Sequence, residues 1–256
     1  MRPPDKLSPL AFARGAAAPL KALAFIWRHT QLWWLAFLPF IINLALFAVF
    51  FWFSYTHLGQ WVRGLLPAGQ GWWWQALIYL LLVLLFLALL ALEVYLFAVV
   101  GRVVCEPFLE LLTRRTERLV PDAPLGAPAH STGLLRDLLR VVRQSILRLL
   151  LFLAVMLPLL LVNLLPGLGG LIYAALAWLV TSFFLALEFI DYPLDRRGLG
   201  LRQKMAYVRG MGLGWLGFGS AALVLGLVPL VNFALLPLAA VGGTLLYLER
   251  PLPPKA

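Results

Sequence analysis

Long apolar stretches dominate the pattern of hydrophobic and polar positions along this chain. Four of them stand out, at residues 32–53, 76–100, 149–187 and 215–248. A helix that crosses the hydrocarbon core of a bilayer, roughly 30 Å thick, needs about 20 apolar residues. The first two stretches, of 22 and 25 residues, are therefore predicted to be complete transmembrane helices.

The basic residues flank these stretches unevenly. Of the 21 Lys and Arg residues, only Arg63 falls between the first two spans, and the others gather on the opposite side once the chain is threaded through a bilayer. Short cytoplasmic loops carry an excess of Lys and Arg. The N-terminus and the C-terminus are therefore predicted to face the cytoplasm.

The two later apolar stretches must return to the side from which they start, because basic residues flank both of their ends. We therefore expect two helical hairpins, at residues 149–190 and 214–249, joined by a basic loop at 191–213. The whole chain, 1–256, is then a single membrane domain that begins with a basic segment at 1–31.

The arms of these hairpins are short for a full crossing. Residues 215–228 number only 14, about 21 Å of helix at ~1.5 Å per residue. We expect both hairpins to penetrate part-way, with tips at Pro166–Gly167 and at Pro229 and Asn232. Because irregular backbone at that depth needs cover from protein, a homo-oligomer is also expected.

Residues 101–148 are predicted to form cytoplasmic helices between the second span and the first hairpin. Residues 108–119 continue the second span. If residues 134–148 form a helix, their spacing gives it one basic face and one apolar face. Such a helix either lies on an anionic lipid surface or packs on the bundle with its arginines in solvent. The sequence leaves both interpretations open.

Composition agrees with a membrane protein, since 62% of the residues are hydrophobic and 12% are charged. The net charge of +10 does not indicate nucleic-acid binding, because the charges sit beside the ends of apolar stretches. Cys105 is the only cysteine, so an intrachain disulfide is excluded. No cleavable signal peptide is evident, and the first span is expected to remain as an anchor.

Signatures of enzymes, metal sites and cofactors are absent from the sequence. Gly212, Gly214 and Gly217 match G-x-G-x-x-G, but they follow a basic loop rather than a strand. Glycines here, with Gly210 and Gly219, are better explained by close approach of helices in a membrane.

Polar residues inside the apolar stretches are candidates for function, because a charge within a bilayer is costly. Glu93 and Glu188 are the acidic ones. Either residue belongs to a proton or substrate pathway, or it pairs with a nearby basic group at the membrane interface. Asn43, Asn163 and Asn232 follow prolines and are expected to hydrogen-bond the backbone groups that those prolines free.

Several short blocks, in this order, resemble the CysZ-type sulfate permeases, within the wider group of etoposide-induced membrane protein domains. The block Asp191-Tyr192-Pro193-Leu194-Asp195 is the most specific. The other positions that carry the resemblance are Gly15, Pro39, Asn43, Pro107, Phe108, Pro166, Gly167, Pro229, Asn232 and Pro237.

The resemblance implies an all-α integral membrane protein with two full spans and two partly inserted hairpins, assembled as an oligomer. It also implies sulfate uptake for sulfur assimilation. One element departs from the family. Sulfate permeases carry a Gly-Leu/Ile-Arg element before the first span, which is attributed to sulfate binding, whereas this chain has Gln31-Leu32-Trp33. Because tryptophan carries no charge, either Arg28 or Lys21 replaces that arginine, or the chain moves a different solute or none.

The leading hypothesis is therefore an inner-membrane anion permease with sulfate as substrate and without a cofactor. Arg28, Gln31, Glu93, Glu188 and Asn232 are its candidate binding or pathway residues. The alternative hypothesis is a protein of the same fold that transports nothing and instead scaffolds partners or organises membrane lipid.

Overall fold

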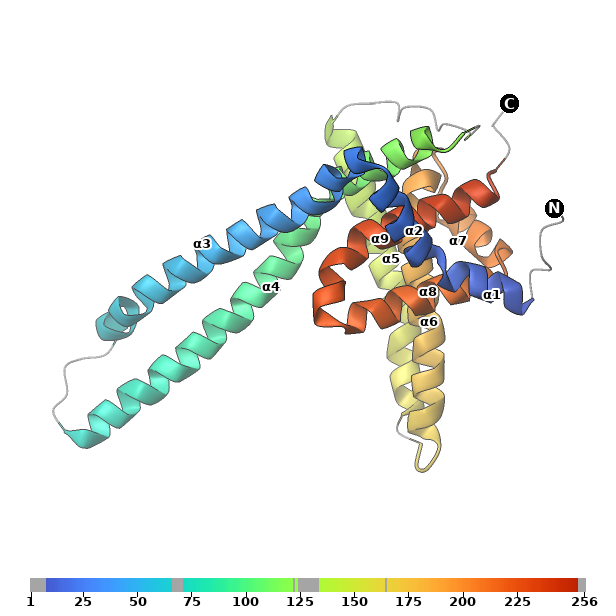
Figure 1. Cartoon of the computed structure of the whole chain (residues 1–256). Coiled ribbons are helices and arrows are strands. Elements are labelled where there is room, and N and C mark those ends of the chain that lie inside the picture. The colour runs from blue at the N-terminus through green and yellow to red at the C-terminus, as the bar shows by residue number, and fades with distance from the viewer. Residues whose placement is uncertain (1–7, 66–70, 122, 124–133, 164, 253–256) are drawn as a thin grey trace. The chain divides into compact units, whose positions relative to one another are not determined.

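The structure is a computed structural model, and every element it describes is a helix (Figure 1). It describes the backbone of residues 8–65, 71–121, 123, 134–163 and 165–252, and most of the side chains in these ranges. The elements are α1 (Pro9–Ala16), α2 (Ala18–Arg28), the short 3-10 helix η1 (Thr30–Leu32), α3 (Trp33–Leu65), α4 (Trp72–Leu119), α5 (Leu134–Val162), α6 (Gly169–Asp195), α7 (Leu201–Gly210), α8 (Leu213–Leu227) and α9 (Pro229–Glu249). The prediction of an all-α membrane fold is confirmed.

The chain divides into two compact units. One unit, Trp34–Phe108, holds α3 and most of α4. Both helices run further than the sequence analysis expected, so that the segment between the two spans is helical at both of its ends. Within α4, Trp72–Leu92 is long and apolar enough to cross a membrane, and none of its most apolar part is buried inside the protein. Such a surface is suited to lipid or to another protein subunit.

The other unit comprises Met1–Trp33 and Leu109–Ala256. Its first hairpin pairs α5 with α6, and the turn between them lies at Pro166–Gly167 as predicted. Gly167 has a φ of +83° there, a backbone conformation that glycine adopts at little cost. At 27 residues, α6 is long enough to cross a membrane by itself.

The start of this hairpin corrects one expectation. Residues 134–148 do not form a separate surface helix, because α5 runs without interruption from Leu134 to Val162. No glycine or proline occurs in this helix before Pro158, so nothing in the local sequence ends it at residue 148. Whether its basic face meets lipid stays a prediction, since most side chains at 134–145 lie outside those described.

The second hairpin pairs α8 with α9, and Val228 forms its corner in an extended conformation. Pro229 occupies the first turn of α9, where its missing N–H has no cost, and Asn232 lies inside that helix rather than at the tip. At 15 residues, α8 spans about 22 Å at ~1.5 Å per residue, which is short for a full crossing.

The expected basic loop at 191–213 is mostly helical. It contains the end of α6 and all of α7, and α7 meets α8 at a bend of 100°. Gly212 lies at this bend with a φ of +61°. A residue with a Cβ would be strained in this conformation, so the glycine is what permits the sharp change of direction.

The helices of this unit approach closely at several glycines, where a Cβ would collide with the neighbouring helix. A Cβ on Gly219 of α8 would lie 1.9 Å from the Ser182 carbonyl oxygen of α6, and one on Gly15 of α1 would lie 2.0 Å from the Gly214 carbonyl oxygen. Gly217 meets α1 in the same way. The G-x-G-x-x-G pattern is therefore used for bending and close packing, although Gly210 has open space around it.

Candidate functional site

The C-terminal end of α6 carries the Asp191–Asp195 block that dominated the resemblance. Both of its aspartates contact Lys204 of α7: the Lys204 ammonium donates to Asp195 Oδ1 at 2.8 Å and also pairs with Asp191 Oδ1. Arg148 of α5 pairs with the other oxygen of Asp191 at 2.9 Å. The Lys204 side chain is only 2% exposed, so these carboxylates neutralise a buried cation.

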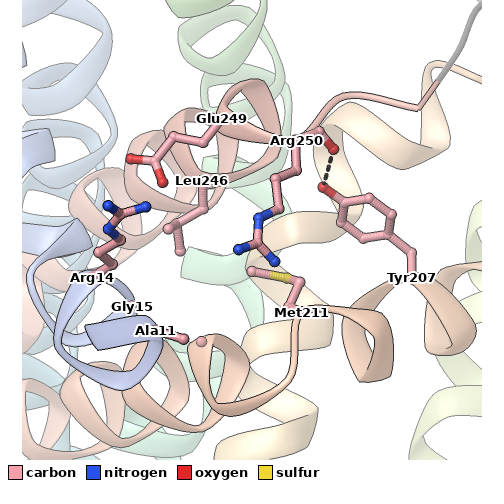
Figure 2. A pocket seen from close by; sticks show the side chains of 9 residues that line it. Ala11, Arg14, Gly15, Tyr207, Met211, Leu246, Glu249 and Arg250 are labelled. Atoms are coloured by element: carbon pink, nitrogen blue, oxygen red, sulfur yellow. Dashed lines mark hydrogen bonds between the residues drawn. The ribbon is translucent and has the colours of Figure 1, made fainter. Parts of the chain in front are cut away.

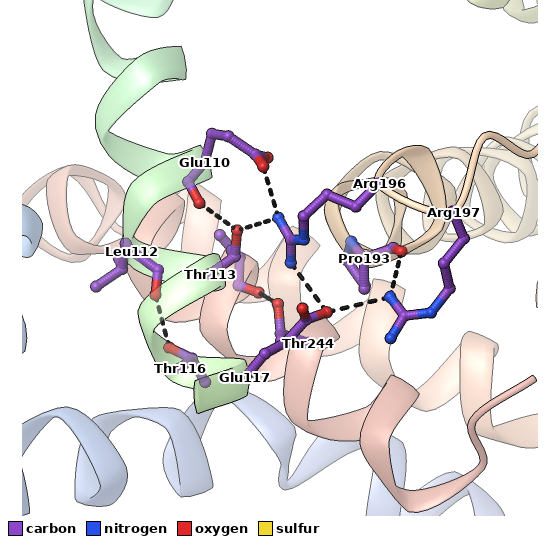
Figure 3. A network of polar contacts seen from close by, with 10 residues as sticks. Glu110, Leu112, Thr113, Thr116, Glu117, Pro193, Arg196, Arg197 and Thr244 are labelled. Carbon is purple, nitrogen blue, oxygen red and sulfur yellow. Dashed lines mark hydrogen bonds and ion pairs between the residues drawn. The ribbon is translucent and has the colours of Figure 1, made fainter. Parts of the chain in front are cut away.

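Arg196, directly after this block, binds the last turns of α4 (Figure 3). Its Nη1 donates to Glu110 Oε1 at 2.9 Å and to Thr113 Oγ1 at 3.0 Å, and its Nη2 lies 3.0 Å from Glu117 Oε1. The side chains of Arg196 and Glu117 are only 5% and 2% exposed. These two opposite charges are thus held together away from water.

Arg197 adds a second cation to the same carboxylate. Its Nη1 lies 3.2 Å from Glu117 Oε1 and donates to the Pro193 carbonyl oxygen at 2.6 Å. The guanidinium also stacks over the Tyr247 ring of α9, 4.3 Å from its centroid, in a cation–π contact. Arg197 therefore links the end of α6 to both α4 and α9.

These eight residues form what we call the charge cluster: Arg148, Lys204, Arg196, Arg197, Asp191, Asp195, Glu110 and Glu117. Burial raises the pKa of Glu110, and the charge and hydrogen bond of Arg196 act against this rise. Burial opposes the charged form of Arg196, but Glu110 and Glu117 outweigh it and raise the pKa of this guanidinium. Because each of its four cations pairs with at least one of its four carboxylates, the charge cluster is suited to joining helices rather than to binding a free anion.

A different set of polar groups lies at the turn before α3. The indole N–H of Trp33 donates to the Ile26 carbonyl oxygen at 3.0 Å. Because tryptophan has a single N–H donor, Trp33 has none left for a solute. Arg28 and Gln31 are exposed beside it. Among the residues that the structure describes, Arg28 has no hydrogen-bond or ion-pair partner.

A small cleft, which we call the cationic cleft, lies among α1, α7, α8 and the end of α9 (Figure 2). Its volume is about 30 Å³, and it is open to the surface. Arg14 and Arg250 supply its positive charge, and the carboxylate of Glu249 is held by Lys21 at 2.9 Å. The remaining lining residues are Ala11, Gly15, Tyr207, Met211, Gly214 and Leu246.

The residues singled out in the sequence fall into several places. Asp191 belongs to the charge cluster, Pro193 supplies a carbonyl acceptor to it, and Glu188 lies half-buried one turn earlier in α6. Pro107 is exposed, Phe108 is half-buried and Pro237 is buried. The side chains of five others lie outside the described part of the chain: Pro39, Asn43, Glu93, Pro229 and Asn232.

The sequence analysis missed Glu110, Glu117 and Lys204. One signal could have found the two glutamates, since positions 110, 113 and 117 share one face of a helix and are all polar. No comparable signal marks Lys204, because its burial depends on how α7 folds back on α6.

The fold and its polar sites define an all-helical integral membrane protein that is built around paired apolar helices. The sequence profile of the family described as Sulfate transporter CysZ/Etoposide-induced protein 2.4 matches residues 18–237. The chain belongs to this family.

Curated relatives support the same assignment. The sulfate transporter CysZ of Pectobacterium atrosepticum is 28% identical over 216 residues, which cover 83% of this chain and 77% of that protein. The namesake from Pseudomonas aeruginosa is 29% identical over 214 residues, or 83% and 86% of the two chains. That from Salmonella typhimurium is 26% identical over 215 residues, or 83% of each.

The family match, over residues 18–237, covers some of these sites but not all of them. It contains the charge cluster and the turn before α3, but it begins after Gly15 and ends before Leu246. The cationic cleft therefore takes Arg14, Glu249 and Arg250 from segments outside the match. Gly15, which the sequence analysis counted toward the resemblance, also lies outside it.

Proposed function

We propose that this protein is a permease of the bacterial inner membrane that moves sulfate into the cell, with no cofactor and no catalytic step. The observation that carries the proposal is membership of the family over residues 18–237, together with three relatives from different bacteria that bear the name sulfate transporter. The distribution of Lys and Arg supports an orientation with both termini in the cytoplasm.

Arg28 is the proposed anion-binding group at the turn before α3, with Gln31 as a neutral donor beside it. Of the two cations that the sequence offered, Lys21 is held by Glu249 at 2.9 Å. Arg28 is exposed, and its guanidinium presents paired N–H donors that suit a tetrahedral dianion. Since Trp33 has its only donor occupied, Arg28 is the group best placed to replace the family's arginine.

Three further residues complete the proposed pathway. Glu188 lies half-buried in α6, before the charge cluster. Glu93 and Asn232 are retained from the sequence, where each interrupts an apolar stretch. Glu93 is proposed to couple anion entry to protons, because a carboxylate within the hydrocarbon core is costly unless it has a function.

Neighbouring subunits and membrane lipid are the proposed partners. The apolar face of Trp72–Leu92 is unburied within the chain, and the short α8 hairpin would leave its tip within the membrane. A homo-oligomer would cover such a tip with protein, and lipid would cover the remaining apolar surface.

The test is uptake of radiolabelled sulfate into proteoliposomes. Wild-type protein is compared with Arg28→Gln, Glu93→Gln and the control Arg202→Gln, which removes an exposed guanidinium from α7. We expect saturable uptake, reduced on the order of tenfold by Arg28→Gln and unchanged by the control. In Glu93→Gln, uptake should lose its dependence on external pH.

An absence of saturable sulfate uptake in wild-type proteoliposomes would overturn the permease proposal and favour the scaffold alternative. Uptake that survives Arg28→Gln at full rate would instead remove this residue from the pathway and leave the transport activity in place.

A further inference from the structure

The helix α2 packs on the rest of its unit through one narrow face. Pro19, Ala22 and Ile26, spaced three and four residues apart, are buried on this face. Most of the helix's contacts are with α9, and a few are with α8. A Cβ on Gly242 of α9 would lie 3.1 Å from the Ala18 carbonyl oxygen. The helix α2 is therefore held closely against the second hairpin.

The opposite face of α2 carries large apolar side chains that are exposed. Leu20, Leu23 and Trp27 are 66%, 47% and 67% exposed. Their spacing of three and four residues places them on one face of the helix, which we call the apolar stripe. Ala24 is exposed on the same face. A contiguous exposed apolar surface of this kind marks a place where a membrane or another protein binds.

A basic edge runs beside the apolar stripe. Lys21 and Arg28, seven residues apart, share one side of α2, and both are exposed. The Lys21 ammonium donates to Glu249 Oε1 at the end of α9 at 2.9 Å, and the two side chains are 47% and 42% exposed. Charged groups from two helices therefore meet at this edge, which is suited to water and lipid headgroups rather than to hydrocarbon.

The chain enters the membrane directly after α2. This helix ends at Arg28, and the apolar stretch 32–53 begins four residues later. Four residues reach about 14 Å at most, so the C-terminal end of α2 lies close to the membrane surface. Tryptophan is enriched at that boundary, and Trp27 ends the apolar stripe. The covering phase that this position offers is lipid.

A parallel orientation to the membrane surface fits the charges better than a crossing does. By length and composition, α1 and α2 together would also pass as one span bent by 41°. However, Arg14, Lys21 and Arg28 follow one another at intervals of seven residues along 9–28. A crossing would bring Lys21 to the middle of the hydrocarbon core, where a charge is costly. A parallel orientation leaves all three cations at the headgroups.

We propose that α2 lies in the plane of the cytoplasmic leaflet, with Leu20, Leu23 and Trp27 in the upper acyl region and Lys21 and Arg28 among anionic headgroups. A helix with one apolar face and a basic edge binds this boundary through buried apolar area and through attraction to anionic lipid. Because α2 packs on α9, it also holds the end of the second hairpin at this surface.

This inference goes beyond the proposed transport function, since it assigns a lipid-binding surface and is measured without a flux. A position among the headgroups leaves Arg28 within reach of a solute from the cytoplasm. Failure of sulfate uptake would overturn the permease proposal and leave the lipid-binding surface in place, and the reverse also holds.

The experiment is electron paramagnetic resonance on the full chain in liposomes of phosphatidylglycerol and phosphatidylcholine. Cys105 is the only cysteine, so a Cys105→Ala background accepts one nitroxide label at a time. Oxygen concentrates in hydrocarbon and a nickel chelate stays in water, so collisions with each reagent report the surroundings of a label. The labelled variants are Leu20→Cys, Leu23→Cys and Trp27→Cys on the apolar stripe, with Lys21→Cys as the matched control on the basic edge.

We expect the three labels on the apolar stripe to collide several-fold more with oxygen than with nickel and to lie at similar depths. The Lys21→Cys label is one residue from Leu20 along the helix but lies on the basic edge. It should therefore be reached by nickel several-fold more than the Leu20→Cys label is. This contrast between neighbouring positions is the mark of a helix that lies in the plane of the leaflet.

Three results would overturn the proposal. Ready access of nickel to every label on the apolar stripe would place this face in water. Few collisions with either reagent would show that protein covers the stripe, as in contact with a second copy of the chain. A steady change in depth of about 10 Å from Leu20 to Trp27, at ~1.5 Å per residue, would show that α2 crosses the membrane.

Where the Cys105→Ala background does not fold, Trp27→Phe in the native chain decides. The emission lost on this substitution should be several-fold smaller in acyl-brominated lipid than in ordinary lipid, because bromine in the acyl region already quenches Trp27 there. An equal loss of emission in the two lipids would overturn the proposal.

Discussion

Replacing Glu117 with glutamine tests whether the charge cluster holds the ends of α4 and α6 together. The Glu117 side chain is 2% exposed, accepts a hydrogen bond from Arg197 at 3.2 Å and forms an ion pair with Arg196 Nη2 at 3.0 Å. Glutamine preserves the shape of the side chain and one carbonyl acceptor. The substitution therefore removes a charge and little else, and it leaves the charge cluster with one unbalanced cation.

The expected cost follows from burial. Removing one partner of a buried ion pair costs about 3–5 kcal/mol, because the other charge stays in the interior without compensation. Since glutamine still offers one acceptor and Glu110 still binds Arg196 at 2.9 Å, we expect the lower end, about 3 kcal/mol. For a chain of this size, that corresponds to a fall in the unfolding midpoint of about 6–12 °C.

The assay is thermal unfolding in detergent, followed by tryptophan fluorescence. Glu249→Gln is the matched control, because Glu249 also pairs with a cation at 2.9 Å but the two side chains are 42% and 47% exposed. An exposed pair contributes about 0–1 kcal/mol, so this variant should shift the midpoint by no more than a few degrees. Combining Glu117→Gln with Arg197→Gln restores charge balance and should recover part of the loss.

Equal midpoints for Glu117→Gln and Glu249→Gln would refute the reasoning, because burial would then make no difference to the energy of the pair. If the double variant loses more in unfolding midpoint than the two single variants lose together, the role assigned to charge balance is contradicted.

Three further predictions concern packing, the turn before α3 and the first hairpin. Gly219→Ala should lower the midpoint by several degrees, because its Cβ would overlap the Ser182 carbonyl oxygen, whereas Gly210→Ala has open space and should not lower it. Trp33→Phe should cost about 1 kcal/mol through the lost indole hydrogen bond and leave sulfate uptake in proteoliposomes unchanged. A cysteine at Gly167, in a background without the native cysteine, should resist impermeant maleimide added from the periplasmic side, and free labelling there would exclude a hairpin that penetrates only part-way.

Much of the helical topology was predictable because membrane insertion depends on local sequence. An apolar stretch of about 20 residues forms a helix in lipid wherever it occurs, so the spans and both hairpins could be placed from 32–53, 76–100 and the later stretches. The turn at Pro166–Gly167 was found in the same way. Boundaries were less predictable: α5 continues through residue 148 because nothing local ends it.

Part of the polar architecture was also visible. The Asp191–Asp195 block pointed to the end of α6, where the charge cluster lies. The other members Glu110, Glu117 and Lys204 could not be assigned from the sequence. Arg196 and Glu110, for example, are 86 residues apart, and no local rule pairs them. The same holds for Arg14 and Arg250, which meet at the cationic cleft from nearly opposite ends of the chain.

The sequence alone determined the class of protein, the helical fold and the sites where the chain reverses, since these follow from hydrophobicity, charge and backbone conformation over short distances. Only the tertiary structure decided which charges neutralise one another. Burial and charge balance depend on helices that pack from distant parts of the chain, and at Gly15, Gly217 and Gly219 that packing rests on the absence of a Cβ.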